Sequence, residues 1–180
     1  MKKIIIVILI FVLTIGILAK PVQRKKSIFN ISYEPYIFYQ PVEENLTIYA
    51  NLLPVSFELA LSDNNGIKIT PIAGLKFFQW GIRFGLLGGS LSFPVYYTKR
   101  TNYSPYKGYF TSGVVSAGYN ISESYFALTA ANETGFSFTM FNVSMAVAFQ
   151  AGGTTFIFSN PSLNKNTVQL GLLLKFGYWM

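Results

Sequence analysis

The chain has 180 residues and a formal net charge of +7, and it contains neither cysteine nor histidine. These absences exclude disulfide bonds, zinc sites built from Cys or His, and every catalytic mechanism that uses a histidine base. Charged residues make up 12% of the chain and aromatic residues 17%, and the mean hydropathy is +0.38. So few charges cannot cover the surface of an ordinary soluble domain, in which roughly 25% of residues are charged.

The first residues have the pattern of an export signal. Two lysines follow Met1, residues 4–18 form an apolar run, and the small residue Ala19 precedes a basic, turn-prone stretch. A run of 15 residues is shorter than the roughly 20 that a transmembrane helix needs. We therefore predict a signal peptide over residues 1–19, cleaved after Ala19. The alternative is an uncleaved N-terminal anchor.

Removal of residues 1–19 from 180 leaves 161 residues, and the loss of Lys2 and Lys3 lowers the net charge from +7 to +5. That length suits a single domain over residues 20–180. No apolar run of 18 residues follows Leu18, so a second helical span is not predicted. Only helices and closed barrels satisfy every backbone group in lipid, so a membrane protein without helical spans must be a closed barrel.

Apolar residues alternate with small or polar ones along most of the remaining chain. The alternation is clear in residues 53–62 and 142–151, and it is strongest in residues 170–180. A period of two gives a strand two different faces, and it does not fit a helix. These segments are therefore predicted to be β-strands.

The less apolar face of these strands consists mainly of Ser, Gly, Ala, Asn and Gln, with few charges. A soluble barrel needs a charged outer face, whereas a transmembrane barrel turns its large apolar side chains toward lipid. Small residues are also what the interior of a narrow barrel can accommodate. We therefore predict an all-β fold, a closed antiparallel transmembrane β-barrel with its large apolar face outward.

Turn signals divide the chain into eight candidate strands. These are residues 28–40, 46–62, 67–78, 80–97, 109–120, 125–131, 136–150 and 168–180. The turn signals lie at residues 63–66, 120–123, 132–135, 152–153 and 160–166, and the longest polar stretch covers residues 98–108. A ten-stranded alternative requires a turn at residues 88–90 and a separate strand at residues 154–159.

The C-terminal stretch, residues 169–180, resembles the last strand of bacterial outer-membrane barrels, in which alternate positions are apolar and the end is aromatic. The matching residues are Leu170, Leu172, Leu174, Phe176 and Tyr178. The stretch departs from that class at Met180, where Phe is usual. The resemblance implies that this strand is the signal read by the barrel-assembly machinery.

Together with its size and export signal, the chain resembles small barrels of the OmpA transmembrane domain, OmpX and OmpW type. The resemblance is architectural and rests on no family-specific motif. It implies a location in the bacterial outer membrane, in contact with its lipids, and leaves the activity open.

One acidic and four basic residues fall on the predicted inward face. These are Glu58, Lys68, Lys76, Arg83 and Lys175. Burying an unpaired charge costs several kcal/mol, so we predict that these residues form a lumen charge network. Two interpretations remain open: a structural network of ion pairs, or a pathway for a small solute or anion.

Few other residues in the sequence suggest a catalytic or binding site. Glu43 and Glu44 are adjacent but fit a solvated loop better than a catalytic pair. The glycines of residues 85–89 lack the lysine of a phosphate-binding loop and fit a bending strand. The basic residues 24–26 have no interleaved aromatic residues, so nucleic-acid binding is not predicted. No cofactor or metal site is predicted.

These observations favour an integral outer-membrane barrel with a structural or small-solute role and no catalysis. One alternative is a soluble secreted barrel that binds an apolar ligand. A second alternative is a lipid-modifying outer-membrane enzyme that works without histidine.

Overall fold

The computed structural model describes residues 28–39, 48–51, 53–78, 81–99 and 106–180. The predicted signal peptide, the basic residues 24–26, Glu43 and Glu44 lie outside these ranges. A search of the described residues finds no helix with the length and apolar character needed to cross a membrane. The described chain is all-β, with a short 3₁₀ turn as its helical element.

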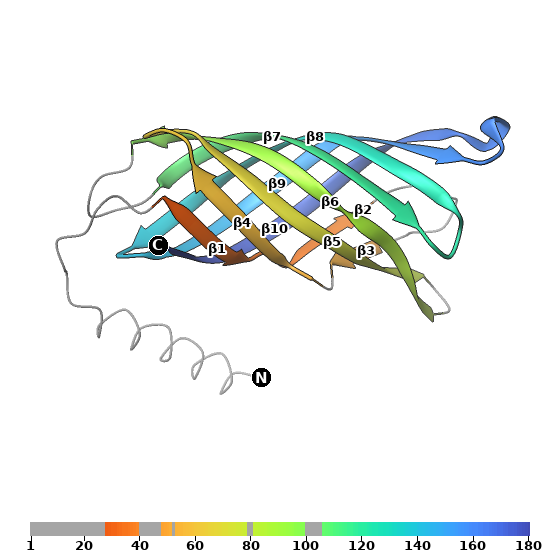
Figure 1. Ribbon diagram of the computed structural model, residues 1–180, viewed down its shortest axis with the longest axis horizontal. Helices are drawn as coiled ribbons and strands as arrows, with labels where there is room; N and C mark the ends of the chain where they lie inside the picture. Colours follow the sequence, from red (N-terminus) through yellow and green to blue (C-terminus); the bar gives the residue numbers. More distant parts are fainter. Residues whose placement is uncertain (1–27, 40–47, 52, 79–80, 100–105) are drawn as a thin grey trace.

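The strands follow one another as β1 (Phe29–Tyr33), β2 (Tyr36–Tyr39), β3 (Ile48–Asn51), β4 (Val55–Ala60), β5 (Gly66–Phe78), β6 (Gly81–Thr98), β7 (Lys107–Asn120), β8 (Tyr125–Met140), β9 (Val143–Phe158) and β10 (Lys165–Trp179). The 3₁₀ turn η1 (Pro161–Leu163) precedes β10. Figure 1 shows these strands wrapped around a common interior.

The strands form one antiparallel sheet that closes into a ring. From β5 to β10, each strand pairs with the next along the chain. The short strands β1 and β2 both pair with β10, and β3 and β4 both pair with β5. Pairing of β1 with β4 and of β2 with β3 completes the ring. Ten strands therefore occupy eight positions.

Two prolines explain why the first two positions of the ring are interrupted. Pro35 separates β1 from β2, and Pro54 lies just before β4. Proline has no N–H group to donate to a neighbouring strand. The chain compensates locally, because the backbone N–H of Glu34 donates to the carbonyl oxygen of Pro54 at 2.5 Å and that of Leu174 donates to Pro35 at 3.2 Å.

The all-β, antiparallel prediction is confirmed, but two predicted turns are wrong. Residues 132–135 lie inside β8, and Gly152 and Gly153 lie inside β9. The chain reverses instead at Phe141 and Asn142, between the paired residues Met140 and Val143. Phe141 has a φ of +57°, a left-handed conformation that favours Gly or Asn, so its residue type does not indicate a turn.

The basis of the ten-stranded alternative is also wrong. Residues 88–90 lie within β6, and the segment from residue 154 continues β9 as far as Phe158. Each of the eight predicted strands shares more than half of its residues with one position in the ring. The turn signals at residues 63–66, 120–123 and 160–166 do separate strands.

Gly135 and Gly152 are required by the close approach of neighbouring backbones. A Cβ atom on Gly135 would lie 2.4 Å from the carbonyl oxygen of Val147 and 2.7 Å from the Cβ of Ala148. On Gly152 it would lie 2.4 Å from the carbonyl oxygen of Ala130. These glycines therefore mark tight contact between β8 and β9.

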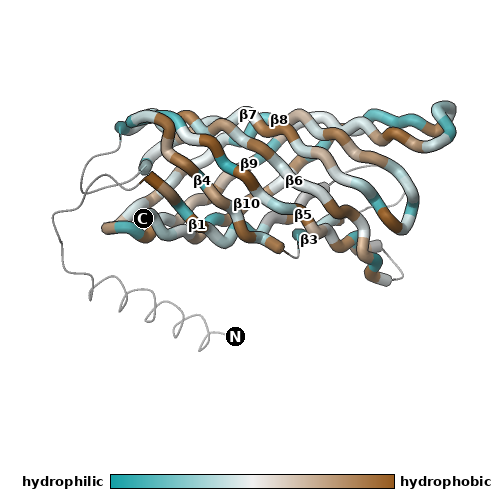
Figure 2. Tube along the Cα trace, in the orientation of Figure 1, coloured by the Kyte–Doolittle hydropathy of each residue, from teal (hydrophilic) through white to brown (hydrophobic). Residues whose placement is uncertain are grey.

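The two faces of the strands differ in burial. In β10, the residues at odd positions from Gln169 to Trp179 are buried, and those at even positions from Leu170 to Tyr178 are exposed. Figure 2 shows the corresponding alternation of hydrophobic and less hydrophobic residues along the strands. Over these residues of β10 the outward face thus carries large apolar side chains only, while the interior face carries Gln169, Gly171, Leu173, Lys175, Gly177 and Trp179.

Gly135→Ala is expected to destabilise the fold, whereas Gly113→Ala is not. The added methyl group at Gly135 must displace the backbone of β9, and overpacking of this kind costs about 1–3 kcal/mol. Gly113, on β7, has no atom within 4 Å of the position that a Cβ would take. Denaturant unfolding followed by tryptophan fluorescence measures both variants. Equal unfolding free energies would contradict the close approach of β9 at Gly135.

Candidate functional site

Six charged residues are buried among the residues that the structure describes, and five of them lie together in a group that we call the central cluster. They are Glu34, Glu58, Lys68, Glu133 and Lys175, and each is at most 9% exposed. Glu34 lies between β1 and β2, and the others lie on β4, β5, β8 and β10. Strands that are far apart in the sequence therefore meet at this cluster.

The two lysines of the central cluster bridge its three carboxylates. The Nζ of Lys175 lies 2.5 Å from Oε2 of Glu58 and 3.4 Å from Oε1 of Glu34. The Nζ of Lys68 lies 3.0 Å from Oε2 of Glu34 and 3.5 Å from Oε1 of Glu133. The contacts alternate in sign from Glu58 to Glu133, so that opposite charges separate like ones.

Hydroxyl groups add hydrogen bonds to the carboxylates of the central cluster. The Tyr96 hydroxyl donates to Oε1 of Glu58 at 2.8 Å. The Ser32 hydroxyl donates to Oε1 of Glu34 at 3.1 Å and also lies 2.6 Å from the Ser56 hydroxyl. A buried ion pair is tolerated only when such hydrogen bonds satisfy its remaining lone pairs.

The structure brings together three of the five residues predicted for the lumen network, namely Glu58, Lys68 and Lys175. Lys76 is buried but lies elsewhere, with its Nζ 2.6 Å from Oε1 of Glu123 in the turn between β7 and β8.

Arg83 is exposed, although its pairing with Lys76 places it on the same face of the sheet as this buried lysine. Arg83 pairs with Lys76 across β5 and β6, but the pairing of β6 with β7 begins only at Leu86. Arg83 therefore lies on a part of β6 that extends beyond the neighbouring strand, where water reaches it.

Sequence reasoning missed Glu34 and Glu133, so the cluster has three acids and two bases where one acid and four bases were predicted. The sequence prediction places Glu133 in a turn, but it lies in the middle of β8. Glu34 follows Asn30 and Ser32 at alternate positions, and all three are buried. The period-two pattern of β1 is the signal that could have placed Glu34 inside.

Aromatic side chains fill the interior at the end of the ring that carries the C-terminus. The rings of Tyr96 and Tyr106 stack with their centroids 4.2 Å apart, and Trp179 meets Tyr106 edge-on at 5.2 Å. The Tyr106 hydroxyl contacts the carbonyl oxygens of Ser62 and Asn65 in the turn before β5. These contacts fix Tyr106 across the interior.

A second aromatic group fills the interior near the opposite end. Tyr125 packs edge-on against Phe156 with centroids 5.0 Å apart, and its hydroxyl accepts a hydrogen bond from Nδ2 of Asn120 at 2.9 Å. The hydroxyl of Tyr49 lies 3.4 Å from that of Tyr125. Tyr49, Tyr125 and Phe156 are all buried.

Small cavities of about 30, 30 and 10 Å³ lie along the interior between these aromatic groups. The first borders Tyr49 and Tyr125, the second borders Lys68 and Glu133, and the third borders Lys175. A water molecule needs roughly 10–15 Å³ of such space, so each cavity has room for one or two waters. These three cavities are therefore water-sized and leave the side chains around them closely packed.

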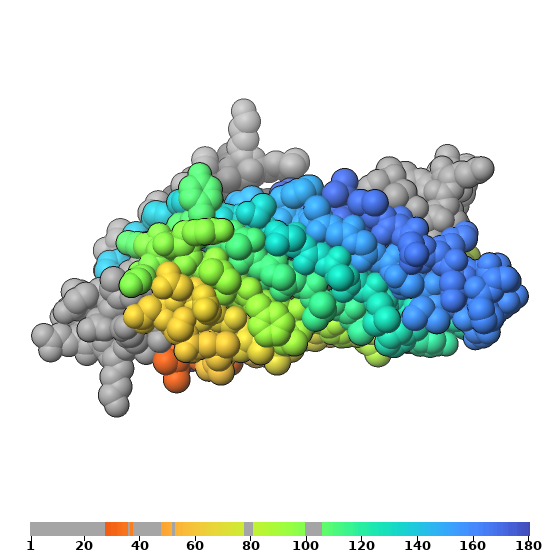
Figure 3. Space-filling model, turned by 90° about the horizontal axis from the view of Figure 1, so that it is seen from above, coloured from red at the N-terminus to blue at the C-terminus, as the bar shows by residue number. Residues whose placement is uncertain are grey.

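A groove of about 640 Å³ lies on the outer surface of the ring. It forms where small residues occupy outward positions on four adjacent strands, namely Gly89, Ala117, Ala130 and Gly153. Figure 3 shows one side of the molecule as a continuous surface over β6–β9. The residues that line the groove carry no ionisable group, so the groove offers no acid–base chemistry.

No protein-family model matches the chain, and neither does any curated protein. Among the residues that the structure describes, no group of three or more His, Cys, Asp or Glu could hold a metal ion.

Glu58→Gln is expected to lower the free energy of unfolding by about 3–5 kcal/mol, because it leaves the Lys175 ammonium without its nearest carboxylate in a dry interior. Glu123→Gln is the control, since the Glu123 side chain is 31% exposed and water can take its place beside Lys76, so the loss should be smaller. Denaturant titration measures both variants.

Adding Lys175→Met to Glu58→Gln should recover part of the loss, because the Lys175 ammonium is then gone and Glu34 keeps Lys68 as its partner. An effect of Glu58→Gln no larger than that of Glu123→Gln would contradict a dry ion pair.

Proposed function

We propose that the chain is an integral β-barrel protein of the bacterial outer membrane with a structural role and no catalytic activity. In this proposal residues 1–19 are removed on export, and the ring spans the membrane. The observation that carries the proposal is the difference between the two faces of the ring: large apolar side chains outside, and charged and hydroxyl groups inside.

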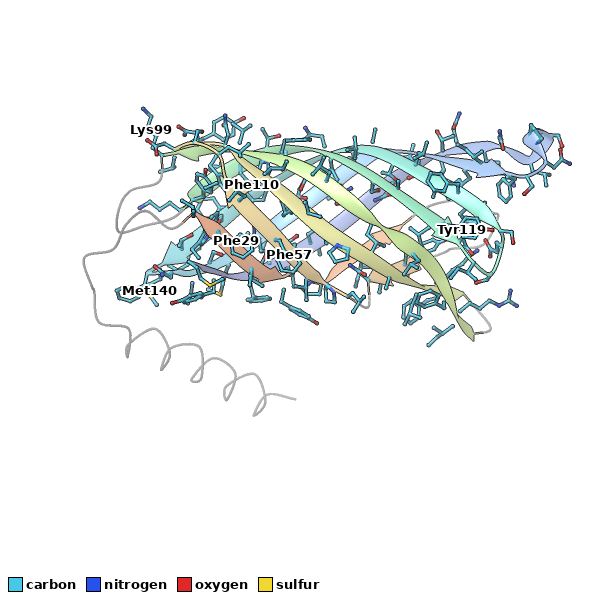
Figure 4. All side chains as sticks on the ribbon, in the orientation of Figure 1. Phe29, Phe57, Lys99, Phe110, Tyr119 and Met140 are labelled. Carbon is cyan, nitrogen blue, oxygen red and sulfur yellow. The ribbon has the colours of Figure 1, made fainter. Side chains whose placement is uncertain are left out.

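The outward face forms an apolar belt. On β10 the outward residues Leu170, Leu172, Leu174, Phe176 and Tyr178 are 41–56% exposed. On β9 and β4, Val147, Phe149 and Phe57 are exposed as well. Figure 4 shows the side chains of Phe29 and Phe57 close together, and their ring centroids are 6.3 Å apart. Exposed apolar surface of this extent is typical of contact with a membrane or another protein.

The closure of the sheet into a ring favours lipid over another protein as the surroundings of the apolar belt. Inside a bilayer no water is present to pair with free backbone N–H and C=O groups, so a sheet must close on itself to satisfy them. The pairing of β1 and β2 with β10 gives the first and last strands of the chain their partners. An even number of positions also keeps both ends of the chain on the same side of the membrane.

Tyrosines and lysines at one end of the ring fit a membrane interface. Tyr97 and Tyr109 are 70% and 69% exposed, and Lys99 and Lys107 are exposed beside them. Figure 4 places Lys99 and Met140 at the end that carries the C-terminus, and Tyr119 toward the other end. Aromatic rings and lysines favour the headgroup region, where they contact both apolar and polar surroundings.

The filled interior favours a structural role over solute passage. Aromatic groups lie at both ends with the central cluster between them, and three cavities among these described residues measure about 30, 30 and 10 Å³. A soluble barrel with an apolar ligand would need an apolar cavity inside and a polar surface outside, which is the reverse of this arrangement. A lipid-modifying enzyme gains no support from the outer groove, which lacks ionisable residues.

Membrane fractionation tests the proposal. Expressed in a Gram-negative host, the protein should begin at Lys20 and remain in the outer-membrane pellet after a carbonate wash, while a soluble periplasmic marker is released. Release of the protein with that marker, or an N-terminus that still begins at Met1, would contradict it.

Phe176→Asp should reduce the amount of folded protein in the same outer-membrane fraction. A lipid-facing Lys or Arg at the midplane costs about 2–4 kcal/mol and an acid costs less, and the substitution also alters the strand proposed to bind the barrel-assembly machinery. Phe176→Leu is the matched control, which keeps the side chain apolar. Heat-modifiable gel migration and outer-membrane yield of Phe176→Asp equal to those of Phe176→Leu would show that residue 176 does not face lipid.

A further inference from the structure

One interior cavity combines an excess carboxylate with an unpartnered hydroxyl group. Its volume is about 30 Å³, and charged residues of the central cluster form part of its wall. We call this cavity the Glu133 chamber. Its polar lining residues are Glu34, Lys68, Thr70, Ser90, Ser92, Ser116, Glu133, Gln150 and Gln169.

Pairing within the central cluster leaves Glu133 as the least neutralised carboxylate. Lys175 lies closest to Glu58, at 2.5 Å, and Lys68 lies closest to Glu34, at 3.0 Å. The contact between Lys68 and Glu133 is longer, at 3.5 Å. Three carboxylates and two ammonium groups therefore give the cluster a formal charge of −1, which is unfavourable away from water.

Ser92 provides a second and independent observation. Its side chain is completely buried and borders the Glu133 chamber. Its Oγ has no hydrogen-bond partner among the residues that the structure describes. A buried hydroxyl without a partner is destabilising, so a ligand in the chamber that contacts this oxygen would remove the penalty.

We propose that the Glu133 chamber binds one monovalent metal cation of the size of Na⁺. A single positive charge balances the excess carboxylate, whereas a divalent ion would leave the cluster positively charged. Carboxylate, hydroxyl and amide oxygens are the ligands that hard cations take, and Glu133, Ser92 and Gln150 supply all three types. The volume suits an ion with at most one water molecule.

Lys68 lies closer to Glu34, at 3.0 Å, than to Glu133, at 3.5 Å, so it neutralises only part of the charge on Glu133 and leaves room for a cation. The site lies inside the ring and does not depend on the proposed location in a membrane. It would tie β6 and β8, which carry Ser92 and Glu133, to the rest of the interior.

Thermal unfolding of the folded full chain in detergent micelles tests the proposal. The protein is measured in NaCl and in tetramethylammonium chloride at equal ionic strength and equal pH. Because a ligand that binds only the folded state stabilises it, the Tm should be about 2–4 °C higher in NaCl, and the effect should grow with the logarithm of the Na⁺ concentration.

Two variants locate the site. Glu133→Gln should abolish the difference between the two salts, because it removes the excess charge. Ser92→Ala removes the unpartnered hydroxyl without adding volume, so it should fold and should need a higher Na⁺ concentration for the same rise in Tm. Glu123→Gln, an acid outside the chamber, is the matched control and should keep the full response.

Equal Tm values of the parent chain in NaCl and tetramethylammonium chloride would overturn the proposal, since they would mean that a proton or water satisfies the chamber. A full Na⁺ response in Ser92→Ala or Glu133→Gln would also overturn it, because the ion would then bind elsewhere. Membrane fractionation of the parent chain is a separate readout, so failure of the cation site is distinguishable from failure of the proposed function.

Discussion

The charged side chains of the interior can be buried only because they pair with one another, and this constraint decides which face of each strand turns inward. Lys175 on β10 and Glu58 on β4 are 117 residues apart in sequence and 2.5 Å apart in the structure. Because side chains alternate along a strand, an inward Lys175 requires Leu174 and Phe176 to point outward. A shift of one residue would bury those apolar groups and expose the ion pair. The charges inside and the apolar belt outside therefore have the same cause.

The filled interior follows from the same arrangement. The central cluster needs a site without bulk water, and the aromatic groups around Tyr106 and Tyr125 provide it at either end. Tyr96 links the two features, since it stacks on Tyr106 and donates a hydrogen bond to Glu58. Such a core holds distant strands together through specific contacts and leaves little space for a solute. This is the physical basis for proposing a structural role.

The sequence predicted the strand faces well, because a period of two is a local property that tertiary contacts do not alter. Glu58, Lys68 and Lys175 could be placed inside on that basis alone. Glu133 could not, since Gly135 beside it resembles a turn residue although it serves close packing against β9. The exposure of Arg83 could not be predicted either, because it depends on where the neighbouring strand begins to pair. The turn at Phe141 has no residue-type signal, and its position is fixed by the register of β8 against β9.

The orientation of β10 in a lipid bilayer tests the account most directly, and the absence of cysteine from the chain allows a single label at any position. Leu172→Cys, Leu173→Cys and Leu174→Cys, each carrying a nitroxide spin label in lipid vesicles, would be exposed in turn to oxygen and to a water-soluble nickel chelate. The account predicts that the labels at 172 and 174 are accessible to oxygen, which dissolves in lipid, and inaccessible to the nickel chelate. The label at 173 should be immobilised and inaccessible to both reagents. Strong collision of the 172 and 174 labels with the nickel chelate would contradict a lipid-facing apolar belt.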